Sequence, residues 1–175
     1  MLNKTAVKLA AAALGMAIAV GANAGSSGPV AMSVTASVAS NCTMTTSNVV
    51  FGTYDPLSGA NATSAGGLTV TCTKGAVPSV TLTMGGNPSG GMRRMTNGTD
   101  FLQYQLYKPL GPGPSDPCPG YGSGTVWDTT AGGTLNMTPA PNKNSRSYNV
   151  CGQMPGAQDV GTGSYADTVD ATVNF

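Results

Sequence analysis

Alternation of apolar and other residues with a period of two is the feature that most constrains this fold. From Val30 to Val38, the even positions are apolar, and the odd positions between them carry Ala, Ser or Thr. Such alternation is typical of a β-strand with one buried face. Similar short segments follow, and turn-forming pairs such as Asp55-Pro56 and Asn97-Gly98 separate them. These segments are 48–54, 67–73, 79–84, 102–107, 145–150 and 164–175.

No segment after residue 24 has a sustained helical stripe of apolar residues. Short strands at roughly ten-residue spacing predict an all-β fold, an antiparallel β-sandwich. The range 109–124 is an exception, because it holds five prolines and five glycines. Proline lacks the N–H group that a central strand needs. We therefore expect this range to be a long surface loop.

Residues 1–24 have the pattern of a secretory signal peptide. Lys4 and Lys8 precede an apolar run at 9–20, and Ala22-Asn23-Ala24 offers a cleavage site between small residues. The apolar run is shorter than the ~20 residues that a membrane-spanning helix needs. We therefore predict a secreted chain with no transmembrane segment after the cleavage site.

The composition argues against several classes of function. The chain has no histidine, and charged residues make up 9% of it. A Ser-His-Asp triad and a Cys-His pair are therefore impossible, and no two aspartates are identifiable as an acid and a base. A net charge of +1 is too small for the phosphate contacts that dominate nucleic-acid binding. We expect no enzyme, no cofactor and no nucleic-acid partner.

Four cysteines, an even number, lie in the predicted secreted part of the chain. They are Cys42, Cys72, Cys118 and Cys151, and an oxidising compartment favours pairing them. Three connectivities are possible. We favour Cys42 with Cys72 and Cys118 with Cys151, because each pair joins near neighbours along the chain. A metal site made of cysteines is the alternative, but the sequence has no Cys-x-x-Cys pair.

An ordered set of motifs extends over nearly the whole chain after residue 24. They are Asn41-Cys42-Thr43, Phe51 to Pro56, Val70 to Gly75, Arg93-Arg94-Met95, Leu102 to Tyr107, Gln158, Gly163 to Val169 and a last strand that ends on Phe175. This set resembles the spore coat protein U domain, the domain of archaic chaperone-usher pilins. The resemblance implies an incomplete immunoglobulin-like β-sandwich that a donor strand from another subunit completes.

The two ends of the chain are compatible with such a completion. We interpret residues 25–38 as an N-terminal donor-strand arm and residues 39–175 as the sandwich domain. The apolar face of the arm consists of Val30, Met32, Val34, Ala36 and Val38. Because the sequence stops on an alternating strand, we expect an acceptor groove there, which a chaperone also contacts. Its candidate residues are Tyr165, Val169, Ala171, Val173 and Phe175, on a face that Asp167 interrupts.

The leading hypothesis that follows from the resemblance is a structural subunit of a surface pilus. Its implied partners are like subunits in a homopolymer, a periplasmic chaperone and an outer-membrane usher, and its implied role is adhesion and biofilm formation. The alternatives are a secreted spore or cell coat protein of the same domain family, and a carbohydrate-binding module.

The aromatic residues Trp127, Tyr104 and Tyr107 could form a sugar-binding platform. Aromatic side chains are more often buried in the core or packed on a sheet face, and we expect that here. The pair Arg93 and Arg94 is expected to lie in a solvated turn instead of binding an anion.

Overall fold

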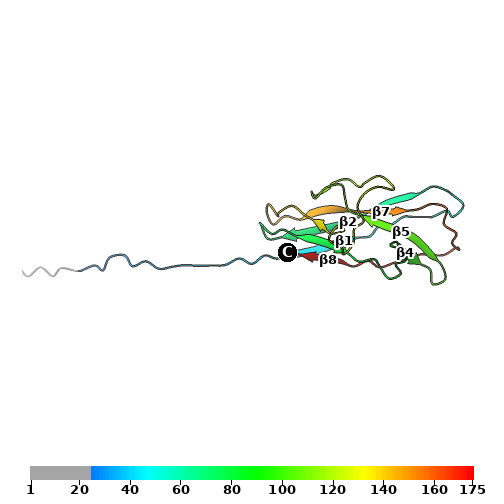
Figure 1. Ribbon diagram of the computed structural model, residues 1–175. Coiled ribbons are helices and arrows are strands. Elements are labelled where there is room, and N and C mark those ends of the chain that lie inside the picture. The colour runs from blue at the N-terminus through cyan, green and yellow to red at the C-terminus, as the bar shows by residue number, and fades with distance from the viewer. Residues whose placement is uncertain (1–24) are drawn as a thin grey trace, which may run out of the picture. The chain divides into compact units, whose positions relative to one another are not determined.

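The computed structural model describes residues 25–175, and this part of the chain is all-β (Figure 1). Its strands are β1 (Cys42–Ser47), β2 (Ala62–Cys72), β3 (Ser79–Leu82), β4 (Arg93–Thr96), β5 (Phe101–Tyr107), β6 (Leu135–Asn136), β7 (Arg146–Met154) and β8 (Ala171–Asn174). The predicted signal peptide, residues 1–24, lies outside the described residues. Residues 37–175 form one compact unit.

The strands form two antiparallel sheets that share one core. The larger sheet has the order β1-β2-β7-β5-β4, and the smaller one has the order β6-β3-β8. Leu68 and Val150 from the larger sheet belong to the same buried cluster as Val80 and Leu82 from the smaller one. The fold is therefore the antiparallel β-sandwich that the alternation predicts. Figure 1 also places β8 beside β1, the edge strand of the larger sheet.

Three segments that were predicted as strands, wholly or in part, do not belong to either sheet. Residues 30–38 and 48–54 form no strand, and within 164–170 there is a single isolated bridge at Ala166. A strand requires backbone hydrogen bonds to a neighbour, and none of these segments has a ladder partner among residues 25–175. Conversely, the alternation missed three strands: β1, β4 and β6, which are six, four and two residues long.

Two disulfides are present, and each joins one cysteine to the next along the chain. Cys42 and Cys72 join β1 to β2 at directly paired positions. Cys118 and Cys151 tie the loop at 109–124 to β7. Both are the near-neighbour pairs that the sequence favours, and the proline-rich range is the long loop that its composition predicts.

Arg93 is fully buried, so the prediction that it lies in a solvated turn is wrong. Its guanidinium donates to the backbone oxygens of Thr83, at 3.0 and 2.6 Å, and of Trp127, at 2.6 Å, and to the side-chain oxygen of Gln105. Burial lowers the pKa of Arg93. Thr83 follows β3 of the smaller sheet and Gln105 lies in β5 of the larger one, so Arg93 connects the two sheets. Arg94 instead places its guanidinium 4.2 Å from the centre of the Phe101 ring.

The substitution Arg93→Met should destabilise the sandwich strongly, because it leaves the backbone oxygens of Thr83 and Trp127 without this donor. The side-chain oxygen of Gln105 keeps a second donor, the backbone N–H of Leu106. Each buried unpaired acceptor costs about 1–3 kcal/mol, so we expect the free energy of unfolding to fall by about 2–6 kcal/mol. Arg94→Met is the matched control and should cost less than about 1 kcal/mol. Urea unfolding of both variants measures the difference, and equal stabilities would contradict the bracing role of Arg93.

Removing either disulfide should also lower stability. The bridges close loops with sequence separations of 30 and 33 residues, for which chain entropy predicts ~3–4 kcal/mol each. The variants Cys42→Ser/Cys72→Ser and Cys118→Ser/Cys151→Ser should both show this loss in chemical unfolding. Mass spectrometry of a non-reducing digest should recover the same two pairs, and a cross-linked peptide that joins Cys42 to Cys151 would refute them.

Candidate functional site

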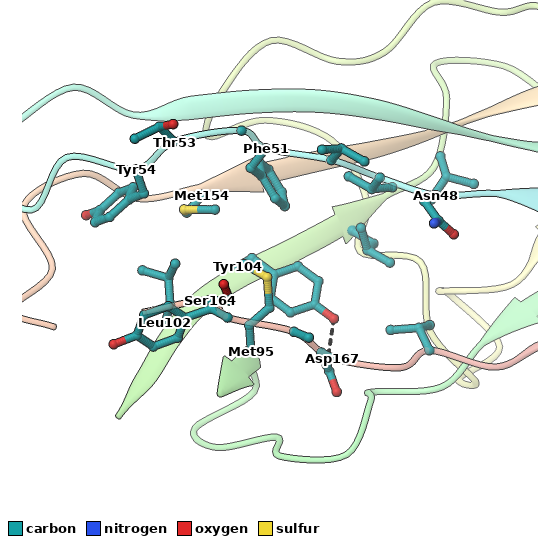
Figure 2. Close-up of a pocket in the computed structure, with 18 of the residues that line it drawn as sticks. Asn48, Phe51, Thr53, Tyr54, Met95, Leu102, Tyr104, Met154, Ser164 and Asp167 are labelled. Atoms are coloured by element: carbon teal, nitrogen blue, oxygen red, sulfur yellow. Dashed lines mark hydrogen bonds between the residues drawn. The ribbon is translucent and has the colours of Figure 1, made fainter. Parts of the chain in front are cut away.

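An elongated groove with a volume of about 870 Å³ opens along the sandwich. One wall is the segment 46–56, which follows β1, and the other is the segment 160–171, which leads into β8. Figure 2 shows Phe51 and Tyr54 along the first wall and Asp167 along the second. The floor consists of apolar side chains from both sheets: Leu68, Leu82, Leu102, Leu106, Val150 and Met154.

The first wall packs closely onto the larger sheet because two strand positions there are glycine. A Cβ atom on Gly66 would lie 2.7 Å from the Val49 side chain. A Cβ atom on Gly152 would lie 2.6 Å from Val49 and 2.7 Å from Phe51. The Phe51 ring also packs edge-on against the Tyr104 ring, with centroids 6.1 Å apart. This wall has no hydrogen-bonded ladder to the sheet, and close packing at the two glycines positions it instead.

Aspartate side chains hold much of the second wall. The carboxylate of Asp167 accepts hydrogen bonds from the Tyr104 hydroxyl at 2.6 Å and from a backbone N–H of the β3–β4 connection at 2.8 Å. The carboxylate of Asp100 accepts one from the backbone N–H of Gly161 at 2.9 Å. These bonds attach residues 160–167 to the larger sheet and to the β3–β4 connection.

The backbone groups of the second wall alternate in direction. Ala166 exchanges two backbone hydrogen bonds with β4, and the backbone oxygen of Asp170 accepts one from the residue after β3. In contrast, the backbone groups of Tyr165, Asp167 and Val169 have no hydrogen-bond partner among the described residues. Successive residues of a strand direct these groups to opposite sides. The odd-numbered residues therefore present an unpaired strand edge to the groove.

The structure places the predicted acceptor residues in two groups. Tyr165, Val169 and Ala171 line the groove. Val173 packs against the core beyond the lining, and Phe175 has 55% of its surface exposed. The residues of the first wall were not among those predicted from the sequence to form the acceptor groove. The alternation within 48–54 was the available signal, since Val49 and Phe51 turn inward.

The arm at 25–38 carries an uncovered apolar face. These residues are in no helix or strand. The exposed fractions of Val30, Met32, Val34 and Val38 are 84–88%, and Ala36 is exposed as well. Large apolar side chains gathered on one exposed segment mark an interaction site or an aggregation hazard.

The described residues do not support the sugar-binding platform. Trp127 and Tyr104 are 0% and 5% exposed, and Tyr107 is half-buried. Within residues 25–175, no group of three or more Cys, Asp, Glu or His side chains is placed to hold a metal ion. No helix in that range is long and apolar enough to cross a membrane.

The fold and the groove together define an all-β domain with an open slot between two chain segments. The family model of the Spore Coat Protein U domain matches residues 29–172, and the chain belongs to this family. Protein U of Myxococcus xanthus is 32% identical over 142 residues, which cover 71% of this chain and 70% of that protein. Membership of this family, together with the fold, makes the chain a structural subunit and not an enzyme.

One similar solved structure is the CsuC-CsuE chaperone-tip adhesion subunit pre-assembly complex from archaic chaperone-usher Csu pili of Acinetobacter baumannii. The similarity has a TM-score of 0.52 and 21% sequence identity. It covers 79% of this chain, which spans 40% of the length of the chain it matches. The likeness shows that this chain has a chaperone-usher pilin fold.

The pair of Tyr104 and Asp167 is the polar element in a mostly apolar groove. Burial of the phenol raises the pKa of Tyr104, and its hydrogen bond to the Asp167 carboxylate raises it further. The folded protein therefore favours the protonated tyrosine, and this stabilisation is fully present below pH 10, the ordinary pKa of the group. It declines as the pH rises above that value.

Tyr104→Phe should destabilise the protein at pH 7, because the Asp167 carboxylate loses one of its donors. A hydrogen bond to a charged group contributes about 1.5–3 kcal/mol. Tyr107→Phe is the control, since no hydrogen bond of its hydroxyl is present among the described residues, and it should cost less than ~0.5 kcal/mol. The gap between wild type and Tyr104→Phe should narrow above pH 10. Denaturation at pH 7 and pH 11 tests this, and a constant gap would show that the phenol does not titrate as described.

Proposed function

We propose that this chain is a structural subunit of a surface pilus and that its groove accepts a strand from another copy. The observation that carries the proposal is an apolar slot whose wall has an unpaired backbone edge at Tyr165, Asp167 and Val169. Buried N–H and C=O groups require partners. An added strand supplies them as a ladder, while its alternate side chains fill the apolar floor.

The arm at 25–38 has the pattern that such a strand needs. Its apolar face extends from Val30 to Val38, nine residues, which span about 26 Å as an extended strand. The stretch 165–173, which runs from the second wall of the groove into β8, has the same length. We therefore assign residues 25–38 as the donor arm and residues 39–175 as the acceptor domain.

Insertion of the arm is energetically large enough to drive assembly. Burying Val30, Met32, Val34 and Val38 contributes ~1.5–3 kcal/mol for each side chain, before the cost of ordering the arm. The sum is comparable with the 5–15 kcal/mol, roughly, that stabilises an ordinary domain. Because donor and acceptor are different surfaces, head-to-tail insertion generates an open filament of like subunits.

An empty groove is an aggregation hazard until the next subunit arrives. A periplasmic chaperone that lends a strand to the same wall removes this hazard, and an outer-membrane usher then exchanges it for the arm. The chaperone-subunit complex named in the similar solved structure supports such a partner. A signal peptide at 1–24 brings the chain to the periplasm, and the assembled pilus serves adhesion and biofilm formation at the cell surface.

A coat protein is the second candidate, and the family name and the likeness to Protein U favour it. In that case the same strand exchange joins subunits into a layer on a spore or cell. Electron microscopy of cells with and without this protein separates the two: the pilus proposal expects thin surface fibres that disappear with the protein. A continuous layer without fibres would favour the coat.

A charge on the inner face of the arm should block assembly. Val34→Asp places an unpaired charge in the apolar groove, which costs several kcal/mol, on the order of 3–5. Thr35→Asp, on the opposite face of the same arm, is the matched control and should assemble normally. Deleting residues 25–38 should prevent assembly as Val34→Asp does. Fibre yield by electron microscopy is the readout, and normal fibres from Val34→Asp would overturn the donor role of the arm.

Moving the arm to the other end of the chain should convert a fibre subunit into a monomer. Residues 25–38, attached through a flexible linker after Phe175 in a protein that lacks the native arm, would insert into their own groove, because the effective concentration is high. This fusion should elute as a monomer and melt well above the arm-deleted protein. If both proteins melt alike as stable monomers, the sandwich needs no added strand.

A further inference from the structure

The inward-facing residues of the second wall and of the arm vary in size and polarity at matching positions. In the wall these positions lie two residues on either side of Val169, and in the arm two residues on either side of Val34. We infer that the arm of one copy lies antiparallel to residues 165–173 of the next, in the register that places Ala36 beside Asp167 and Met32 beside Ala171. This inference rests on the proposed strand insertion and adds to it the register and the residue that sets it.

Asp167 is the polar position on the inward face of the wall. Its carboxylate accepts hydrogen bonds from Tyr104 Oη, from the N–H of Gly86 and from the N–H of Thr168, at 2.6, 2.8 and 2.9 Å. The side chain is half-buried. The backbone of Gly85 lies against the carboxylate, since a Cβ atom there would lie 2.0 Å from it. Asp167 also lines the groove, so an inserted strand passes over it.

A strand that enters the groove must cover this carboxylate with one of its inward side chains. A large apolar side chain displaces the remaining water and leaves a charge without a cationic partner, which is costly. A methyl group covers the position and leaves room for water. Ala36 is the small residue on the apolar face of the arm, which otherwise carries valine and methionine.

The other distinctive position on the inward face of the wall is Ala171, a small apolar residue. With Val169 taken as the centre of the wall, Asp167 precedes it by two residues and Ala171 follows it by two. In the arm, Met32 precedes Val34 by two residues and Ala36 follows it by two. An antiparallel arrangement with Val34 opposite Val169 therefore matches the longest arm side chain with the small wall residue, and the smallest one with the carboxylate.

Other directions or registers of the arm cover the Asp167 carboxylate with a larger side chain and fill the space at Ala171 less well. A parallel arm with the same centre places Met32 over the carboxylate and Ala36 opposite Ala171, which leaves an unfilled volume. An antiparallel arm shifted by two residues places Val34 or Val38 over the carboxylate and separates Met32 from Ala171. The register with Ala36 at Asp167 is the one that avoids both a covered charge and a void.

Pairs of engineered cysteines in the full chain test direction and insertion separately. Directly opposed residues in an antiparallel pair lie about 4.5–5.5 Å apart at Cα, within the range that a disulfide needs. Met32→Cys/Ala171→Cys should link copies into a covalent ladder on non-reducing gels. Ala36→Cys/Ala171→Cys, which a parallel arm would join, should not. Val34→Cys/Val169→Cys joins the central pair in both directions, and the single variants control for mispairing with the native cysteines.

The outcomes separate the register from the proposed function. A ladder from Val34→Cys/Val169→Cys together with one from Ala36→Cys/Ala171→Cys, and none from Met32→Cys/Ala171→Cys, means that the arm inserts in the parallel direction. If wild-type fibres form but the central pair gives no ladder, the register is wrong. If deletion of residues 25–38 leaves fibres unchanged, the proposed function itself fails.

An exchange of two arm residues gives a second test with unchanged composition. Met32→Ala/Ala36→Met should reduce assembly, because it places methionine on the carboxylate and leaves a void at Ala171. We expect at least about a tenfold loss of fibre, since a single void or covered charge costs 1.4 kcal/mol or more. In the parallel direction, the same exchange would repair both mismatches and increase assembly. Equal or greater fibre yield would therefore overturn the inference.

Discussion

The backbone groups of Tyr165, Asp167 and Val169 face a groove in which the described sandwich provides no hydrogen-bond partner. Water can satisfy these groups, but the apolar floor beside them gains from being covered. A single extended strand meets both requirements, because it supplies a ladder through its backbone and apolar contacts through alternate side chains. Membership of the Spore Coat Protein U domain family and the pilin fold are consistent with this arrangement.

A wall that lacks one neighbouring strand must be held by other interactions. Asp100 and Asp167 attach the second wall through their carboxylates, and Gly66 and Gly152 let the first wall approach the sheet. Arg93 connects the two sheets through backbone and side-chain oxygens. In a chain with only 9% charged residues, several of the charged groups thus maintain the shape of the acceptor site.

Much of the sandwich could be predicted from the sequence, because alternation reports which face of a strand is buried. Val49 and Phe51 turn inward as the pattern indicates, although their segment is not a strand: alternation does not reveal whether a partner strand exists. The burial of Arg93 could not be predicted, since its acceptors come from segments that are distant in sequence. The contact between Tyr104 and Asp167 joins residues 63 positions apart and was hidden for the same reason.

Residue-resolved hydrogen exchange of the soluble subunit and of the assembled fibre tests the central claim most directly. We expect the amides of Tyr165, Asp167 and Val169 to exchange rapidly in the subunit and to become strongly protected in the fibre. The amide of Ala166, which already donates to the backbone oxygen of Thr96, should be protected in both. Rapid exchange of the three amides in the fibre would mean that no strand pairs with this edge, which would contradict strand insertion at the groove.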